Sequence, residues 1–386
     1  MAATPTYPGV YIEEISPGTG TISGVPTTMT GFVGAFREGP LNSPVEVLGW
    51  SDFVSTFGDP DTTADQAVYA VRQFFENGGT HGFVVRVGSS DAAGLIGNEA
   101  AHTGIHALDA VDVLNLLCVP DTANLPDREA AAVITTTQRY CERRRAFYIV
   151  DPPQQDENRD EVDGIAAWLV ANLHLRSRNA AVYVPRLLLP DGLTAYAPSG
   201  AVAGVYVRTD SRRGVWRAPA GTEADLRGIG GLRCEFGDRE GGVLNPLGIN
   251  VIRTFSHGTV VWGARTMQGE DDQGSEWKYV PVRRMALFLE ESLYRGTQWA
   301  VFEPNDEPLW AQLRSNIGSF MDNLFRKGAF SGSTPRDAYL VKCDSETTTQ
   351  IDIDRGIVNI LVGFAPLKPA EFVIIKIQQL AGQTQA

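Results

Sequence analysis

The chain lacks the short motifs that mark the commonest enzyme sites. No glycine-rich phosphate loop of the GxxxxGK[ST] or GxGxxG type occurs, and no GxSxG nucleophile elbow is present. Its four cysteines, Cys118, Cys141, Cys234 and Cys343, are widely spaced and form no CxxC pair. This spacing argues against a disulfide or zinc framework and predicts buried free thiols in a protein made inside the cell.

Positive charge is also scarce. The chain has 33 Lys and Arg residues against 46 Asp and Glu residues, a net charge of −13, and its few lysines all lie in the last third. This balance argues against a nucleic-acid-binding surface and suits a soluble protein. No basic-then-apolar signal peptide opens the chain and no run approaches transmembrane length, so we expect no direct membrane insertion.

The remaining composition is that of an ordinary globular protein. At 386 residues and 43% hydrophobic content, the chain is long enough for two or three domains. Between Val113 and Leu188, apolar runs alternate with stretches of helical periodicity. Strands are expected over Val113–Val119, Ala146–Val150 and Ala180–Leu187, with helices over Asp127–Arg145 and Glu161–Leu175. This alternation predicts an α/β region with a mainly parallel sheet.

Other segments are simpler to assign. The pattern predicts helices from Ser51 as N-cap to Phe57, and over Asp65–Asn77, Pro281–Arg295 and Glu307–Lys327. In the last of these, Pro308 lies in the first turn, Gly328 follows the end, and an apolar stripe runs from Leu309 to Leu324. Strands are expected near Ile351 and Ile357. The Gly-, Arg- and Pro-rich stretch Pro198–Gly242 predicts a domain boundary.

Both ends of the chain read as short strands. Near the C-terminus, Ile357–Phe364 and Phe372–Leu380 are apolar runs separated by Pro366 and Pro369, which cannot donate ladder hydrogen bonds. Near the N-terminus, Tyr7–Ile15 alternates apolar and polar residues before a Gly/Thr/Ser-rich tether. The C-terminal strand either completes the chain's own sheet or pairs with another chain. The matching strand at the N-terminus favours exchange of strands with neighbouring copies. Such contacts build a helical assembly of subunits when the rotation from one copy to the next does not close into a ring.

The exchanged residues predicted for the N-terminal arm are Tyr7, Val10, Tyr11, Ile12, Glu13 and Glu14. Those predicted for the C-terminal arm are Phe372, Val373, Ile374, Ile375, Lys376 and Ile377.

Two groups of residues deserve a chemical reading. Asp121 and Asp151 each follow a predicted parallel strand, where α/β enzymes bind ligands, but both lie beside proline, where aspartate is a common turn residue. An α/β enzyme that uses these two carboxylates is the alternative function. His102 and His106 have a metal-ligand spacing if helical, yet no further ligand lies at a motif distance, so solvated histidines are expected. We therefore expect no catalytic residue, metal or cofactor.

Several long blocks carry a resemblance to a known family. They are YPGVYIEE at the start, Gly31–Gly58, Leu244–Met267, Trp277–Leu313 and the closing GFAPLKPAEFVIIKI. In sequence and order they resemble the contractile tail sheath proteins of phage tails, R-type pyocins and extracellular contractile injection particles. The chain is similar to the compact members of that family.

The resemblance implies a structural subunit that polymerises helically around an inner tube and contracts to drive the tube through a target envelope. Its implied partners are further copies of the chain in stacked hexameric rings, the tube protein, and baseplate and terminal cap proteins. Such a protein is assembled in the bacterial cytoplasm and becomes extracellular after lysis, within a phage tail or tail-like particle.

The resemblance also implies a division of the chain. An N-terminal arm (1–20) would precede an outer α/β region (21–235), an inner α+β domain (236–365) and a C-terminal arm (366–386), with the arms exchanged between subunits. In the family's inner domain a helix presents charged residues to the tube, and Glu307–Lys327 matches it by position. The candidate tube-facing residues are Gln312, Arg314, Ser315, Asp322, Asn323, Arg326 and Lys327.

Overall fold

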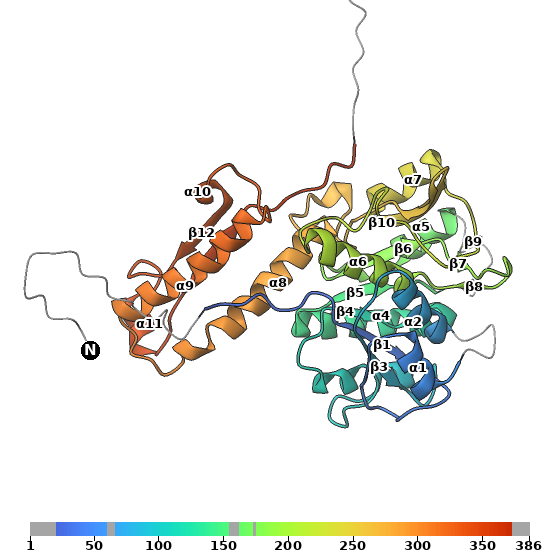
Figure 1. Cartoon of the computed structure of the whole chain (residues 1–386), viewed down its shortest axis with the longest axis horizontal. Helices are drawn as coiled ribbons and strands as arrows, with labels where there is room; N and C mark the ends of the chain where they lie inside the picture. The colour runs from blue at the N-terminus through green and yellow to red at the C-terminus, as the bar shows by residue number, and fades with distance from the viewer. Residues whose placement is uncertain (1–20, 60–65, 154–161, 173–174, 373–386) are drawn as a thin grey trace, which may run out of the picture.

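The computed structural model describes residues 21–59, 66–153, 162–172 and 175–372 (Figure 1). These residues form a large lobe built on a β-sheet and a smaller lobe, and the long helix α8 (Val280–Gly296) runs from one lobe to the other (Figure 1). Within the described residues, none of the helices combines the length and apolar character needed to span a membrane.

The large lobe contains an eight-stranded sheet. Across the sheet the strands lie in the order β11 (Gly258–Val261), β10 (Ile249–Phe255), β6 (Ala180–Val184), β5 (Phe147–Val150), β4 (Leu116–Cys118), β1 (Thr30–Gly34), β3 (Gly82–Arg86) and β2 (Val45–Val47). The six inner strands are parallel, and only the two edge strands β11 and β2 are antiparallel to their neighbours. The mainly parallel sheet predicted from the sequence is therefore confirmed.

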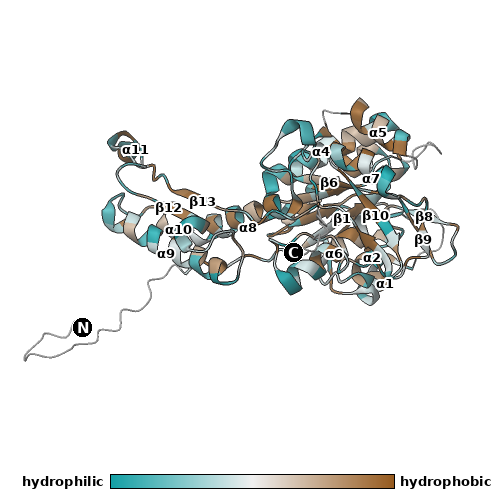
Figure 2. Cartoon of the chain, turned by 90° about the horizontal axis from the view of Figure 1, so that it is seen from above, coloured by the Kyte–Doolittle hydropathy of each residue, from teal (hydrophilic) through white to brown (hydrophobic). Residues whose placement is uncertain are grey.

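Helices cover both faces of this sheet. On one face lie α1 (Trp50–Phe57), α2 (Gln66–Glu76) and α6 (Ser199–Arg213), and on the other lie α3 (Ala92–Ile96), α4 (Asp127–Arg144), α5 (Val162–Ala171) and α7 (Asp238–Leu244). Consecutive strand residues enter opposite cores, as Phe32 and Val33 do, because side chains alternate along a strand. Figure 2 shows hydrophobic residues along the strands and hydrophilic residues on the outer helices.

Shorter elements fill the connections of the large lobe. A small sheet consists of β8 (Ala195–Tyr196), β7 (Leu187–Leu188) and β9 (Gly231–Leu232). The 3-10 turns are η1 (Gly104–Ala110), η2 (Pro120–Asn124), η5 (Asn245–Leu247), η6 (Asp271–Gln273) and η7 (Gln298–Ala300).

Helix α6 contradicts the irregular boundary predicted for Pro198–Gly242. Residues 199–208 of this helix are all buried, and it packs against α2. A Cβ added at Gly200 would lie 2.0 Å from the carbonyl oxygen of Ala70, and one at Gly204 would lie 2.5 Å from that of Phe74. The glycines that indicated a loop instead allow two helix backbones to approach closely.

Two local predictions were also wrong. Helix α1 begins after Gly49, and Ser51 is not its cap; Asp52 accepts a hydrogen bond from the Leu48 amide instead. Near Ile351 the chain forms helix α11 (Gln350–Asp354), not a strand, because Thr349 and Asp352 make a capping box.

The small lobe is built around helix α9 (Glu307–Arg326), with α10 (Pro335–Ala338), α11 and the antiparallel pair β12 (Tyr339–Lys342) and β13 (Leu361–Phe364). Its core unites the apolar faces of α8 and α9, with Met285, Ile317 and Met321 buried between them. Residues 21–29 run along α8, where the Val25 amide donates to Ser292 Oγ over 3.1 Å.

The large sheet does not end at residue 235, where the resemblance places the end of the outer region. Strands β10 and β11 follow that position and still belong to the eight-stranded sheet. The change of lobe occurs along α8. The division into outer and inner domains thus stays a prediction, with its structural break further along the chain.

Candidate assembly surfaces

The polar face of α9 carries the candidate tube-facing residues. Leu309, Leu313, Ile317, Phe320, Met321 and Leu324 are all buried, so the predicted apolar stripe is confirmed. Asp306 caps the helix by accepting from the Leu309 amide over 3.2 Å. Pro308 lies in its first turn, and Gly328 follows its end with a φ of 73°. Gln312, Ser315, Asn323, Arg326 and Lys327 are exposed, whereas Arg314 and Asp322 are half-buried.

Some of these charges already have partners within the small lobe. Arg314 Nη2 donates to Glu307 Oε1 over 2.6 Å, and its Nη1 donates to the Cys343 carbonyl oxygen. Arg326 pairs with Asp322 one turn earlier, over 2.6 Å. Lys327 forms no ion pair with any residue that the structure describes. Among the candidates, the groups with the fewest internal ties are the exposed amides, Ser315 and Lys327.

The candidate arm residues fall mostly outside the described part of the chain. Tyr7, Val10, Tyr11, Ile12, Glu13 and Glu14 all lie there, as do Val373, Ile374, Ile375, Lys376 and Ile377. Phe372 is described, and its side chain is 73% exposed.

The C-terminal segment is attached to the large lobe immediately before that arm. After β13 the chain returns from the small lobe (Figure 1), and Glu371 meets the fully buried side chain of Arg265. Arg265 Nε and Nη2 donate to the two Glu371 carboxylate oxygens, each over 2.7 Å, and Tyr279 Oη donates to Oε2 over 3.2 Å. A bidentate, shielded pair fixes both position and direction, so the arm starts from a defined point.

The remaining guanidinium nitrogen of Arg265, Nη1, is also hydrogen-bonded within the large lobe. It donates to the Asn245 carbonyl oxygen over 2.7 Å and to Asp271 Oδ1 over 3.0 Å. The hydrogen bond with Glu371 and the nearby carboxylates raise the pKa of the Arg265 guanidinium although burial opposes this. The guanidinium therefore stays charged, and removing Glu371 would leave it underpaired.

The two carboxylates proposed for an enzyme instead support the backbone. Both lie at the carboxyl edge of the sheet, after β4 and β5, and both are buried. Asp121 Oδ2 accepts from the Ala35 amide over 2.8 Å, and Asp151 Oδ1 accepts from the Ser199 amide at the start of α6 over 3.1 Å. Burial raises the pKa of Asp151 to about 7. Each carboxylate therefore joins the end of its strand to the backbone of another segment.

The histidine pair is not arranged as a metal site. His102 is exposed with a φ of 52°, and His106 lies in the 3-10 turn η1. The two therefore do not share an α-helical face. The expectation that both are solvated is wrong for His106, which is buried with its ring edge-on to Tyr140 at 5.6 Å. Over the described ranges, no group of three or more His, Cys, Asp or Glu side chains is placed to hold a metal.

The cysteines are free, as predicted. Cys118, Cys141 and Cys343 are buried, and burial raises the pKa of each thiol. Cys234 is only half-buried, so the predicted burial does not extend to it.

The Arg265–Glu371 attachment was missed from the sequence. Arg265 follows the apolar residues Val260–Trp262, and a buried arginine needs an anionic partner, but the local sequence does not mark this arginine as buried. Its partner lies 106 positions away along the chain. No spacing rule would have connected the two residues.

Comparisons with known proteins agree with these features. Residues 272–379 match the phage tail sheath C-terminal domain. The chain is 24% identical to the tail sheath protein of Vibrio phage KVP40 over 91% of its own length, and spans 57% of the length of that relative.

Solved structures match over nearly the whole chain. The sheath complex of the extracellular contractile injection system PVC, in the contracted state, is 30% identical with a TM-score of 0.77, covering 98% of this chain and 99% of that one. A chain from the 6-fold symmetrised baseplate of the anti-feeding prophage is 30% identical with a TM-score of 0.77, covering 97% and 99%. The contracted helical sheath of the same particle is 30% identical with a TM-score of 0.76, covering 97% and 100%.

Proposed function

The chain belongs to the contractile tail sheath family, and we propose that it is a structural subunit that polymerises helically around an inner tube and contracts to drive that tube through a target envelope. The observation that carries this proposal is the near full-length match to sheaths in the contracted state. The chain is part of a phage tail or of an extracellular contractile injection particle. We place its synthesis and assembly in the bacterial cytoplasm, before release by lysis.

The chain is not an enzyme. The relatives to which it is similar are structural sheath proteins. The backbone contacts of Asp121 and Asp151 give both carboxylates a structural role that needs no substrate.

Subunits are proposed to be linked by exchanged terminal strands. The small lobe supports this, because its sheet has only the strands β12 and β13 within the described residues. An isolated pair of strands is marginally stable, and an unpaired edge is a template for another strand. The outer face of the pair is partly apolar, with Leu340 and Leu361 each 52% exposed. Strands 7–15 and 372–380 of neighbouring copies would complete this sheet.

The proposed partners follow from this arrangement. When one surface of a copy binds a different surface of the next copy, the contacts build an open helix if the rotation does not close. The 6-fold symmetry of the similar anti-feeding prophage baseplate supports stacked hexameric rings. The small lobe would be the inner one, with the exposed side chains of α9 toward the tube and the large sheet outside. Baseplate and cap proteins would bind the two ends of the stack.

The test is assembly of the purified full-length chain, viewed by negative-stain microscopy with and without the tube protein. We expect long tubes that sediment at high speed. Removing residues 1–18 or 373–386 should leave a folded subunit that forms none. The second truncation keeps Glu371, so Arg265 retains its partner. Closed oligomers or monomers of the intact chain under all conditions would overturn the sheath proposal, and tubes from either truncation would overturn strand exchange.

A further inference from the structure

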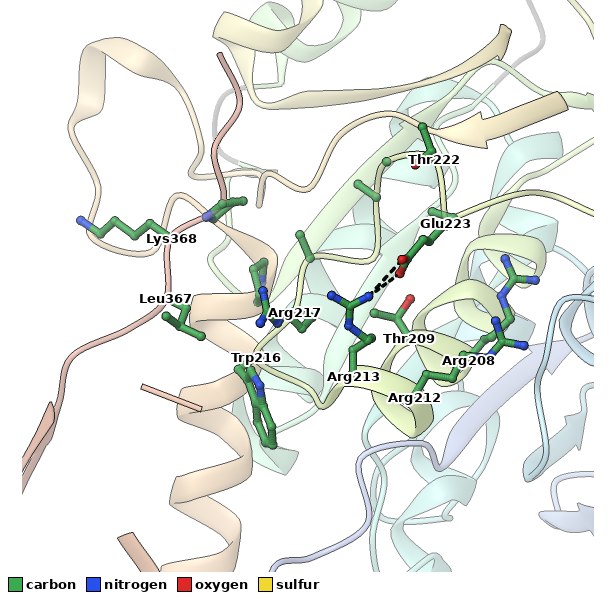
Figure 3. Close-up of a pocket in the computed structure, with 16 residues that line it drawn as sticks. Arg208, Thr209, Arg212, Arg213, Trp216, Arg217, Thr222, Glu223, Leu367 and Lys368 are labelled. Carbon is green, nitrogen blue, oxygen red and sulfur yellow. Dashed lines mark hydrogen bonds and ion pairs between the residues drawn. The ribbon is translucent and has the colours of Figure 1, made fainter. Parts of the chain in front are cut away.

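A cluster of arginines lines a cavity of about 350 Å³ beside the base of the C-terminal segment (Figure 3). Arg208, Arg212 and Arg213 come from the last turns of α6, Arg217 from the loop that follows, and Lys368 from the C-terminal segment (Figure 3). The only carboxylate among the described lining residues is Glu223. In a chain of net charge −13, this concentration of positive charge is unusual.

Internal ion pairs account for only part of the cluster. Arg213 Nη1 pairs with Glu223 over 2.8 Å, and Arg208 Nη2 pairs with Asp225 over 3.0 Å. Arg212, Arg217 and Lys368 make no ion pair with the residues that the structure describes. The dipole at the end of α6 favours Arg212 and Arg213, but it does not reach Arg217 or Lys368 on other segments. The cavity lining thus includes three cations without an ion pair among the described residues, although Figure 3 shows the Lys368 side chain extending away from the arginines, so Arg212 and Arg217 are the two for the test.

The N-terminal arm has the matching charge. Residues 1–36 contain no lysine or arginine, and their only acidic residues are the adjacent Glu13 and Glu14. We infer that the arginine cavity binds Glu13 and Glu14 of a second copy of the chain, next to the point where the C-terminal segment leaves the body. This inference rests on the proposed exchange of terminal strands and assigns one of its docking surfaces.

Geometry favours a second copy over the chain's own arm. Residues 22–27 run along α8 away from the cavity: Arg284 donates to the Thr27 carbonyl oxygen near the start of the helix, and Ile22 contacts Gly296 at its end. The cavity is at the start, beside Pro281, so the helix separates Ile22 from it by about 22 Å. An extended chain from Thr21 back to Glu14 spans at most about 25 Å. The chain's own arm would have to run fully extended back over residues that already cover the helix.

Charge exchange tests the pairing in the full chain. Arg212→Glu with Arg217→Glu should lower the yield of sedimentable sheath at least tenfold, as should Glu13→Arg with Glu14→Arg. The variant with all four changes should recover most of the yield. Arg128→Glu with Arg139→Glu, two exposed positions on α4, is the matched control and should assemble normally. Failure of the combined variant to recover, or equal loss in the control, would overturn the pairing.

Disulfide trapping separates the two sources of the arm. In a Cys234→Ser background, Glu14→Cys with Arg217→Cys should give a ladder of linked subunits on a non-reducing gel, whereas Glu14→Cys with Arg128→Cys should not. A disulfide formed only within single subunits, without a ladder, would show that the arm docks on its own chain. A second contrary result has two parts: no disulfide forms, and the arginine reversal variant loses assembly only in the presence of tube protein. This result would mean that the cavity meets the tube. Either result contradicts the inference.

These outcomes are distinct from failure of strand exchange itself. If the subunit without residues 1–18 assembles normally, the arms are not the linkage and the proposed function needs revision. If that truncation abolishes assembly while the double arginine reversal does not, only the assignment of this cavity is wrong.

Discussion

The two lobes differ in how completely they satisfy their own β-strands. In the large lobe the inner strands are buried on both faces, and the edge strand β11 is covered by residues 221–226, with the Leu226 amide donating to the Thr259 carbonyl oxygen over 2.8 Å. In the small lobe β12 and β13 have only each other as strand partners within the described residues. The edges of β12 and β13 therefore lack a strand partner among the described residues, and strand exchange is our proposal for what pairs with them.

This difference indicates where a sheath subunit depends on its neighbours. A buried parallel sheet of six strands requires nothing from outside, so the large lobe can keep its structure while subunits move. The small lobe has a helical core and a sheet of two described strands, which we propose other chains complete by strand addition. Contraction would then be a rigid-body rearrangement of large lobes around a connected inner network.

The largest expected effect tests where along its length the bridging helix is anchored to the large lobe. Arg284 in α8 pairs with Asp210 in α6 through hydrogen bonds of 2.9 and 2.7 Å, and both side chains are buried. Arg284→Met should lower the free energy of unfolding by about 3–5 kcal/mol, because it leaves the Asp210 carboxylate buried without a counter-charge. Urea unfolding of the free subunit measures this loss.

Two controls accompany that measurement. Combining Arg284→Met with Asp210→Leu should recover most of the stability, since no charge then remains buried. At the other end of α8, Arg295 is partly exposed and pairs with the largely exposed Asp112 and with Glu291, which keeps Arg145 as a second partner. Arg295→Met should therefore cost only about 1 kcal/mol. Both partners belong to the large lobe, so equal losses at both ends would contradict the view that the helix is anchored mainly through its buried first half.

The next effect is a pH dependence that belongs to the large lobe. Burial raises the pKa of Asp151 from its ordinary value of 3.8 to about 7. The folded state therefore binds this proton more tightly than the unfolded state does. The resulting stability is fully present below about pH 4 and is lost as the pH rises toward 7. Over that window the loss has an upper bound of roughly 4 kcal/mol.

Replacing Asp151 by asparagine tests this assignment. Asp151→Asn keeps an oxygen acceptor for the Ser199 amide and removes the titrating group. We expect the variant to be more stable than the wild type at pH 8 and nearly equal at pH 4, as measured by urea midpoints at both values. If the urea midpoint of the variant changes between pH 4 and pH 8 as much as that of the wild type, other groups cause the pH dependence.

The large lobe was also the easier one to predict from sequence. The strand at Phe147–Val150 and the helix at Asp127–Arg144 are each made of contiguous residues with clear periodicity, so local patterns identify them. Helix α6 was missed because the two glycines that let it approach α2 are also loop signals. Their role depends on residues 66–76, which no local window around residue 200 contains.

The candidate surfaces were less predictable for the same reason. The apolar stripe of α9 is a local pattern and was found. The bidentate contact of Arg265 with Glu371 and the arginine cavity each combine residues more than 100 positions apart. Such contacts depend on how the lobes fold together, which composition and spacing do not encode.

Hydrogen exchange would sharpen the comparison further. In the free subunit the amides of β12 and β13 should exchange faster than those of β5, because marginally stable elements open locally. In assembled sheath their exchange should slow by about 100-fold, equivalent to about 2.7 kcal/mol of added stability, while β5 (Phe147–Val150) should change little. Equal protection of β12 and β13 in both states would mean that no strand is added to this sheet.

The smallest effect on folding, and the most specific effect on assembly, is expected at the end of α9. The side chain of Arg326 is 78% exposed, and its one ion pair among the described residues is with Asp322 in the preceding turn. Exposed pairs of this spacing contribute about 0.3–0.5 kcal/mol. Arg326→Glu with Lys327→Glu should therefore change the free subunit's urea midpoint only slightly. It places negative charge at the helix C-terminus and beside Asp322, where both interactions are unfavourable.

The effect on assembly should be larger, if this helix end meets the tube. A contact that holds in the extended state and separates on contraction should be small and polar, and salt screens such a contact. We expect the double variant to lower the yield of extended sheath on purified tube by several-fold, and the wild type to show a similar fall as salt rises. Gln312→Ala with Ser315→Ala, on the same exposed face but without charge, is the matched control and should retain salt-dependent assembly. Normal yield on tube from the double charge variant would remove Arg326 and Lys327 from the interface, and would leave the open strands β12 and β13 as the small lobe's main route to its neighbours.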